Sequence, residues 1–371
     1  MSVLPRIFYA ISDLFVSSSP STGYFFNTGF NNVYTGANSG VNLIQSLSRI
    51  QSVNDSWNQP RLNVGQLGQV AIIDRIIVEP PTVPLEFSYV LSDLSNERKI
   101  GFDVSGINGC LANILNLTQT DKTYFIGITP AGQDVIGYTG QMQTKYVTNG
   151  YLGSWSTEAA VGGLPTTTVS VQGFNWATST GSINQPLQAI DYNKNVLTTG
   201  NLFTLPVATS GITNTVAAVR PAEITATISN SGIGLNMNAL RLQRYNFSFN
   251  LNLQKLSQLG AFFPYALVIQ FPVDVTASIT AYWSDLTADT LSRLGCNDPT
   301  FTVQAQLSQP HCLGQPASTL AAQFTLVGAK LDSQTFSENL SDVASTVTLN
   351  FTSTLGSATD PNHNFFMSGL N

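Results

Sequence analysis

The feature that most constrains the fold is an alternation of apolar and polar side chains at a period of two. It is clearest between residues 245 and 253, where the apolar members are Tyr245, Phe247, Phe249, Leu251 and Leu253. Successive side chains of a β-strand point to opposite faces, so this alternation predicts a long strand with one buried and one wet face. The pattern recurs at 83–89, 224–228, 273–281 and 347–351. The chain is therefore predicted to be all-β.

The chain also resembles itself. Residues 49–94 align without a gap on residues 241–286, 192 positions later, with about 14 identities in 46 positions. The identities include Gln66-Leu67-Gly68 and Ser92-Asp93-Leu94. Such a repeat indicates duplication of a whole domain. Two domains are predicted, 1–195 and 196–371, each a β-sandwich or barrel, with the boundary in the Gly-, Asn- and Thr-rich stretch between 180 and 215.

The two copies differ at three positions of the repeated strand. The first copy has Asp55, Gln59 and Arg61 where the second copy has Phe247, Leu251 and Leu253, respectively. A strand that loses its apolar face in this way is predicted to face solvent or a different neighbour.

Helix signals are few. The best candidate is 286–294, with Ser284 or Asp285 as N-cap and Gly295 after its end. The corresponding segment of the first copy, 95–98, carries less of this pattern. We expect one short helix in each domain.

Charge is scarce. Charged residues make up 10% of the chain, the formal net charge is -6, and the sequence has no run of Lys and Arg that could follow a phosphate backbone. We expect no specific nucleic-acid binding.

The three cysteines are odd in number and irregularly spaced, which argues for a reducing compartment during synthesis. No stretch reaches the roughly 20 apolar residues of a membrane helix, and the apolar start is interrupted by Asp13 and predicts no signal peptide.

A series of short motifs runs through the chain in order. It comprises Gln66-Leu67-Gly68, Glu79-Pro80-Pro81-Thr82-Val83, Asn96-Glu97 before Gly101-Phe102, Tyr124-Phe125-Ile126-Gly127 leading to Pro130 and Asp134, Leu152-Gly153-Ser154-Trp155-Ser156, Val161-Gly162-Gly163-Leu164-Pro165-Thr166 and Gly328-Ala329-Lys330-Leu331-Asp332-Ser333-Gln334. With this ordered set, residues 20–355 resemble the tail tube proteins of bacteriophages. The chain departs from the commonest form of that family, which has one domain per chain.

The resemblance implies a virion structural protein, made in the host cytoplasm and located in the virion tail. Long hairpins of neighbouring domains would join into a barrel around a channel, and the rings would stack into a tube. A six-fold ring would need three two-domain chains, so we expect a homotrimer. The resemblance also implies a tape-measure protein inside the tube during assembly, other tail proteins and, in some tails, a sheath outside. Double-stranded DNA would pass as non-specific cargo.

A channel for DNA must avoid binding phosphates, because each Lys or Arg contact releases counterions and adds affinity. Acidic side chains on the wet faces of the repeated strands are therefore candidates for the channel lining. They are Glu86, Asp93, Asp274 and Asp285. A solvated outer face is the simpler interpretation for each of them.

Catalytic and metal-binding patterns are absent from the sequence. The two histidines, His311 and His363, have no triad context, and His311, Cys312 and Cys296 lack the spacing of a zinc site. We expect no catalytic site, no metal and no cofactor.

Two other functions stay open. One is a distal tail or baseplate protein that forms a single ring. The other is an adhesin or carbohydrate-binding module, in which Trp57, Trp155, Trp176 and Trp283 would form a sugar platform.

Overall fold

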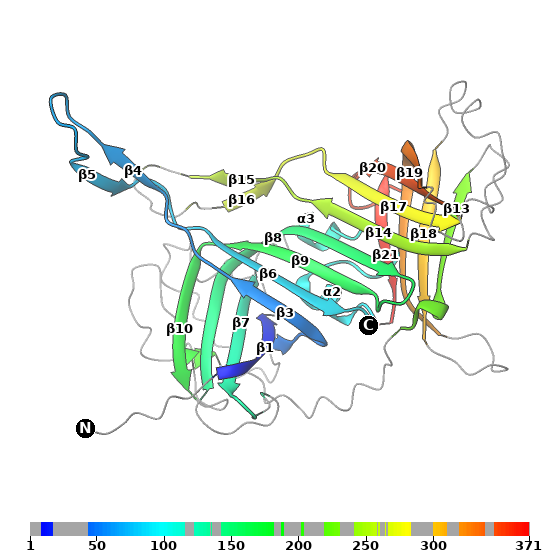
Figure 1. Ribbon diagram of the computed structural model, residues 1–371, viewed down its shortest axis with the longest axis horizontal. Helices are drawn as coiled ribbons and strands as arrows, with labels where there is room; N and C mark the ends of the chain where they lie inside the picture. The colour runs from blue at the N-terminus through cyan, green and yellow to red at the C-terminus, as the bar shows by residue number, and fades with distance from the viewer. Residues whose placement is uncertain are drawn as a thin grey trace.

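The computed structural model describes residues 9–17, 44–115, 122–133, 135, 142–181, 187–188, 202–203, 219–230, 241–257, 259, 264, 266–282, 300–309, 319–337 and 345–370. Antiparallel pairings join fifteen strands of these segments into one network, with three separate two-stranded pairs (Figure 1). The all-β prediction is confirmed. No helix within the described segments is long and apolar enough to cross a membrane.

The described residues of the first half form twelve strands and two short helices. The elements are β1 (Tyr9–Ser17), β2 (Ile44–Ser46), β3 (Ile50–Asp55), β4 (Arg61–Val64), β5 (Asp74–Ile77), β6 (Val83–Val90), α2 (Ser95–Ile100), α3 (Ala112–Leu115), β7 (Lys122–Pro130), β8 (Met142–Ala160), β9 (Thr166–Gly173), β10 (Asn175–Gly181), β11 (Leu187–Gln188) and β12 (Leu202–Phe203). The predicted boundary at residue 195 lies outside the described residues.

The second half repeats the long strands. Its elements are the 3-10 turn η2 (Pro221–Glu223), β13 (Ile224–Asn230), β14 (Leu242–Asn250), β15 (Leu253–Leu256), β16 (Ala266–Ile269), β17 (Asp274–Tyr282), β18 (Phe301–Ser308), β19 (Leu320–Ser337), β20 (Thr346–Thr354) and β21 (Asn364–Gly369). The helix predicted at 286–294 lies outside the described residues. In the first half the corresponding segment forms α2, which ends at Gly101 in the left-handed conformation.

The strand pairings of the two halves match in register. β3 pairs with β6 as β14 pairs with β17, with residue numbers 192 apart and the same one-residue irregularity, at Ile50/Ser52 and at Leu242/Arg244. The hairpins β4–β5 and β15–β16 also match at this separation. In the later strands, β7–β8 matches β18–β19 at a separation of 179, with one shared irregularity at Lys122/Tyr124 and at Phe301/Val303. Pairings β8–β9 and β8–β10 correspond to β19–β20 and β19–β21, where β9 matches β20 at a separation of 180 and β10 matches β21 at a separation of 189.

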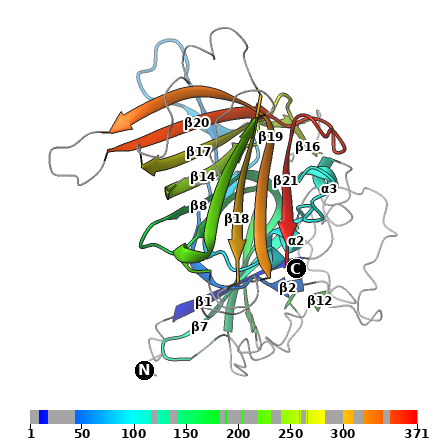
Figure 2. The ribbon, with the colours of Figure 1, turned by 90° about the vertical axis from the view of Figure 1, so that its right-hand side faces the viewer.

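Eight strands form what we call the main sheet. Their order is β3-β6-β9-β8-β14-β17-β20-β19, with β8 contributing 151–160 and β19 contributing 330–337. The long strands β8 and β19 continue into two cover sheets, β2-β1-β7-β8-β10 and β13-β18-β19-β21. Figure 2 shows the cover strands β18, β19 and β21 crossing the direction of main-sheet strands β14 and β17.

One large core lies on the inner face of the main sheet. The inner side chains of β6, β14 and β17 are buried in strict alternation, as the period of two predicts. Leu85, Phe87, Tyr245, Phe247 and Ile279 are among them, each with no exposed surface. At about 25 cal/mol per Å² of apolar surface removed from water, such side chains contribute roughly 1.5–3 kcal/mol each.

Candidate assembly interface

The two halves are joined by strand pairing between β8 and β14. Residues 154–160 of β8 run antiparallel to 244–250 of β14, with Trp155 opposite Phe249 and Thr157 opposite Phe247. The ladder continues beyond both ends of β14, where Val161 N donates to Gln243 O and Leu251 N donates to Gly153 O. We call this pairing the internal junction. It makes one continuous sheet from two repeated halves.

Aromatic side chains fill the inner side of the internal junction. Trp155 lies 5.7 Å from Phe249, 5.5 Å from Phe324 and 5.7 Å from Phe365, measured between ring centroids. Phe247 lies 6.2 Å from Phe324 and 5.6 Å from Phe365. Such aromatic pairs stabilise by about 0.5–1.5 kcal/mol beyond their area burial. The internal junction is therefore a hydrophobic core.

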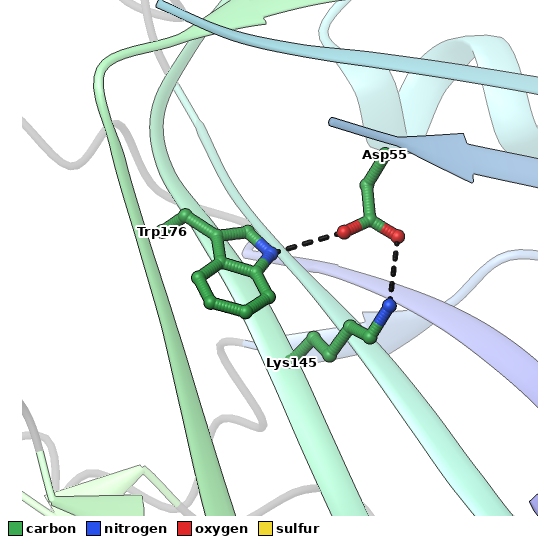
Figure 3. Close-up of polar contacts among 3 residues, drawn as sticks. All are labelled: Asp55, Lys145 and Trp176. Atoms are coloured by element: carbon green, nitrogen blue, oxygen red, sulfur yellow. Dashed lines mark hydrogen bonds and ion pairs between the residues drawn. The ribbon is translucent and has the colours of Figure 1, made fainter. Parts of the chain in front are cut away.

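At the matching place in the first half, three residues joined by two polar contacts replace the aromatic group Phe247, Phe324 and Phe365. The strand registers put Asp55 in place of Phe247, Lys145 in place of Phe324 and Trp176 in place of Phe365. Figure 3 shows Asp55 between its two partners, accepting a hydrogen bond from Lys145 Nζ at 3.1 Å and one from Trp176 Nε1 at 3.0 Å. We call these three residues the polar triad. Each carboxylate oxygen of Asp55 therefore accepts a hydrogen bond.

The outer edge of β3 and the end of β19 form the two ends of the main sheet. Among the described strands, β3 pairs only with β6, and residues 330–337 of β19 pair only with β20. Trp57, just after β3, is 64% exposed, and Phe336 of β19 is 40% exposed. An exposed strand edge is a template for pairing with another chain. The residues of β3 are all partly buried or exposed. This agrees with the expectation that the strand of the first copy faces solvent or a different neighbour.

The two extended hairpins differ at their bases. Leu267 of β16 is buried with Tyr151 and Phe174, and Leu253 of β15 packs against them. In β4–β5 the matching positions are Arg61 and Arg75. The hairpin β4–β5 extends away from the sheets (Figure 1), with Leu62, Ile76 and Ile77 about half exposed.

The outer face of the main sheet is polar and nearly uncharged. Its side chains are chiefly Ser, Thr and Asn, and cross-strand pairs include Ser52 with Ser88 at 2.6 Å and Ser248 with Thr276 at 2.8 Å between hydroxyl oxygens. By register and burial pattern its charged members in the described strands include Glu86, Glu158, Arg244, Asp274 and Lys330, and the exposed Asp332 lies at the irregularity of β19 between Leu331 and Ser333. Arg244 and Glu158 form an ion pair across the internal junction.

The four acids proposed from the sequence fall into three situations. Glu86 and Asp274 lie on the exposed outer face of the main sheet, on β6 and β17. Asp93 is only 8% exposed and accepts hydrogen bonds from the backbone N and the hydroxyl of Ser95 at the start of α2. It is therefore held by α2 and is not on the wet face of a strand. Asp285 lies outside the described residues.

A buried carboxyl on α2 was not anticipated from the sequence. Glu97 has no exposed surface, and the Tyr89 hydroxyl donates to Glu97 Oε1 at 2.6 Å. Within the described residues Glu97 Oε2 has no hydrogen-bond partner. Burial raises the pKa of Glu97 to about 8 and also raises the pKa of Tyr89. The Asn96-Glu97 pair in the sequence gave no sign of this, because the burial of Glu97 depends on the tertiary contact between α2 and Tyr89 of β6.

Other candidates do not gather into a chemical site. Trp155 is buried, Trp57 is exposed and Trp176 bonds to Asp55, while Trp283 lies outside the described residues. The tryptophans of the described segments therefore form no sugar platform. His363 is exposed, and His311, Cys312 and Cys296 lie outside the described residues. Within those residues no group of three or more His, Cys, Asp or Glu side chains could hold a metal ion.

Comparison with known proteins gives little. No family model and no curated protein matches the chain. Among solved structures, a chain of the anti-feeding prophage baseplate determined by cryo-electron microscopy with six-fold symmetry is similar over 40% of this chain and 93% of that chain. The identity is 13% and the TM-score is 0.28. At these values the likeness carries no argument about function.

Proposed function

We propose that this chain is a virion structural protein, a tail tube subunit with two diverged copies of the tube domain. Three chains would form a ring with six pseudo-equivalent domains, and the rings would stack into a tube that conducts double-stranded DNA. The role is structural and not catalytic. Its partners would be other copies of the chain, the tape-measure protein, further tail proteins and, where the tail contracts, a sheath.

The observation that carries the proposal is the main sheet. It consists of two matched four-strand units, joined by the pairing of β8 with β14. Its two ends are β3, which matches β14, and the end of β19, which matches β8. Repetition of one such contact adds units without changing the geometry, and a ring results when the rotation closes. Closure of the ring would pair both exposed edges, so that neither could pair with other chains and cause aggregation.

The outer face of the main sheet suits a passive channel. Beside the ion pair of Arg244 and Glu158, its charged side chains in the described strands include two acids, Glu86 and Asp274, and one base, Lys330, among neutral Ser, Thr and Asn side chains. A face with so few cations would release few counterions from DNA and would bind it weakly. A channel lined by this face would let the duplex slide.

The test is negative-stain electron microscopy of the purified chain over a concentration series, with mass photometry of the same samples. We expect hollow tubes or stacked rings whose smallest closed unit has the mass of three chains. Isolated rings that never stack would replace the tube with a single-ring tail-end protein. A chain that stays monomeric at all concentrations would contradict both.

A further inference from the structure

The two ends of the main sheet are copies of the two strands that meet at the internal junction. β3 matches β14 at a separation of 192 residues, and β19 matches β8 at a separation of 179, both by pairing register. The internal junction therefore shows how an edge of the β3 kind sits against an edge of the β19 kind. In one chain these two edges stand at opposite ends of the sheet and have no such neighbour among the described strands.

Side-chain exposure differs between the internal junction and the matched positions at the two ends of the main sheet. Phe249 is 4% exposed at the internal junction, and its counterpart Trp57 is 64% exposed. Thr157 of β8 is fully buried, and its counterpart Phe336 of β19 is 40% exposed. A large aromatic side chain at an exposed strand edge is a typical anchor of an interface.

The side chains around the two edges are more polar than those of the internal junction. The polar triad replaces three phenylalanines, and Gln334 stands where β8 has Trp155. The Asp55 carboxylate already has two donors, so a neighbour can cover it without leaving a buried charge unpaired. Before assembly both edges are in contact with water, and after assembly they are in contact with each other. Polar side chains with hydrogen-bond partners suit both states, whereas the side chains of an internal core never meet water.

We infer that β3 of one copy pairs antiparallel with the end of β19 of a second copy, in the register of the internal junction. Transferring that register puts Asp55 opposite Phe336, Ser56 opposite Thr335, and Trp57 opposite Gln334. The contact is head-to-tail, because each copy supplies one edge of each kind. The inference rests on the proposed self-assembly and adds to it the two strands, their direction and their register.

The register can be tested by disulfide formation in the assembled full-length chain. The variant S56C/T335C places one cysteine on each edge, on the outer face of the sheet. Directly opposite residues have Cβ atoms about 4.5–5.5 Å apart, close to the disulfide range, whereas diagonal neighbours are about 7–8 Å apart. Matched controls are S56C/S333C and S56C/S337C, which report a slip of two residues in either direction. The parent chain controls for its own three cysteines.

We expect S56C/T335C to give a ladder of covalent multimers on a non-reducing gel, at least tenfold more than either slipped pair. An equal mixture of S56C and T335C single variants should stop at dimers, because each chain then has one reactive edge. Rings without this cross-link, or with a slipped pair cross-linked instead, would overturn the inferred register and leave the ring proposal standing. Absence of any assembly would overturn both.

Discussion

Trp57 and Phe249 occupy the same position in the two halves of the chain, yet Trp57 is 64% exposed and Phe249 is 4% exposed. Phe249 is covered by Trp155 across the internal junction, with ring centroids 5.7 Å apart. Trp57 directly follows β3, the strand that matches β14 and that lies at one end of the main sheet. The same fold position is thus core in one half and surface in the other.

The first prediction uses this pair. Replacing Trp57 by Ala should change the free energy of unfolding of the monomer by no more than about 0.5–1 kcal/mol, because the side chain is largely exposed. It should weaken self-association at least tenfold. The matched variant F249A should cost about 3–5 kcal/mol of folding stability. Urea unfolding at low concentration and sedimentation velocity over a concentration series separate the two effects; unchanged association of W57A would contradict the prediction.

The second prediction concerns the polar triad. The variant D55A removes the acceptor for Lys145 Nζ and Trp176 Nε1, and should cost about 1–3 kcal/mol in unfolding free energy. The double variant D55F/K145F restores the aromatic composition of Phe247 and Phe324 beside the existing Trp176. It should be more stable than D55F alone, since replacing both members of an ion pair by apolar groups is often neutral or stabilising. A double-mutant cycle in urea measures the coupling, and a D55F/K145F chain less stable than D55F would refute this.

The third prediction is a pH dependence from Glu97. Its pKa is about 8 in the folded chain, against an ordinary value of 4.5 for a glutamate carboxyl. The folded state therefore holds a proton that the unfolded state releases, and stability should fall as pH rises from about 4.5 to 8. The slope from this one group is at most about 1.4 kcal/mol per pH unit. Below this window the neutral carboxyl contributes fully, and above it the contribution is lost.

The variant E97Q tests this dependence, because glutamine keeps the shape of the neutral acid. Thermal or urea unfolding between pH 5 and 8 should show a shallower loss of stability than the parent chain. Charge-neutral replacement of an exposed acid, E86Q, is the matched control and should leave the slope unchanged. Parallel pH profiles for E97Q and the parent would show that Glu97 does not titrate in this range.

The fourth prediction compares two matched backbone positions. Asn149 has φ 51° and Gly328 has φ 72°, and the registers of β8 and β19 place them at the same point of each half. A Cβ at Gly328 would press on the backbone of Asn362, in a conformation that L side chains rarely adopt. G328A should therefore cost at least about 1–2 kcal/mol. N149G should stay within about 1 kcal/mol of the parent in urea unfolding, and equal costs for the two would contradict the argument.

Some of this structure follows from the sequence directly. The period of two fixes which side chains of β14 and β17 are buried, since one face of a strand must meet the core. The match at 192 residues anticipates that β3–β6 and β14–β17, and the two hairpins, share one register. The exchange of Phe247 for Asp55 already indicates that the first-copy strand has other surroundings.

Other relationships were decided only by the tertiary structure. The pairing of Trp155 with Phe249, and the meeting of Asp55 with Lys145 and Trp176, join residues about 90 or more positions apart along the chain. No local pattern specifies such contacts, because strand partners are chosen by the packing of whole sheets. Burial of Glu97 and Asp93 has the same origin. The sequence by itself determined the strands and their repetition, and the arrangement of the sheets determined which edges are joined and which remain open.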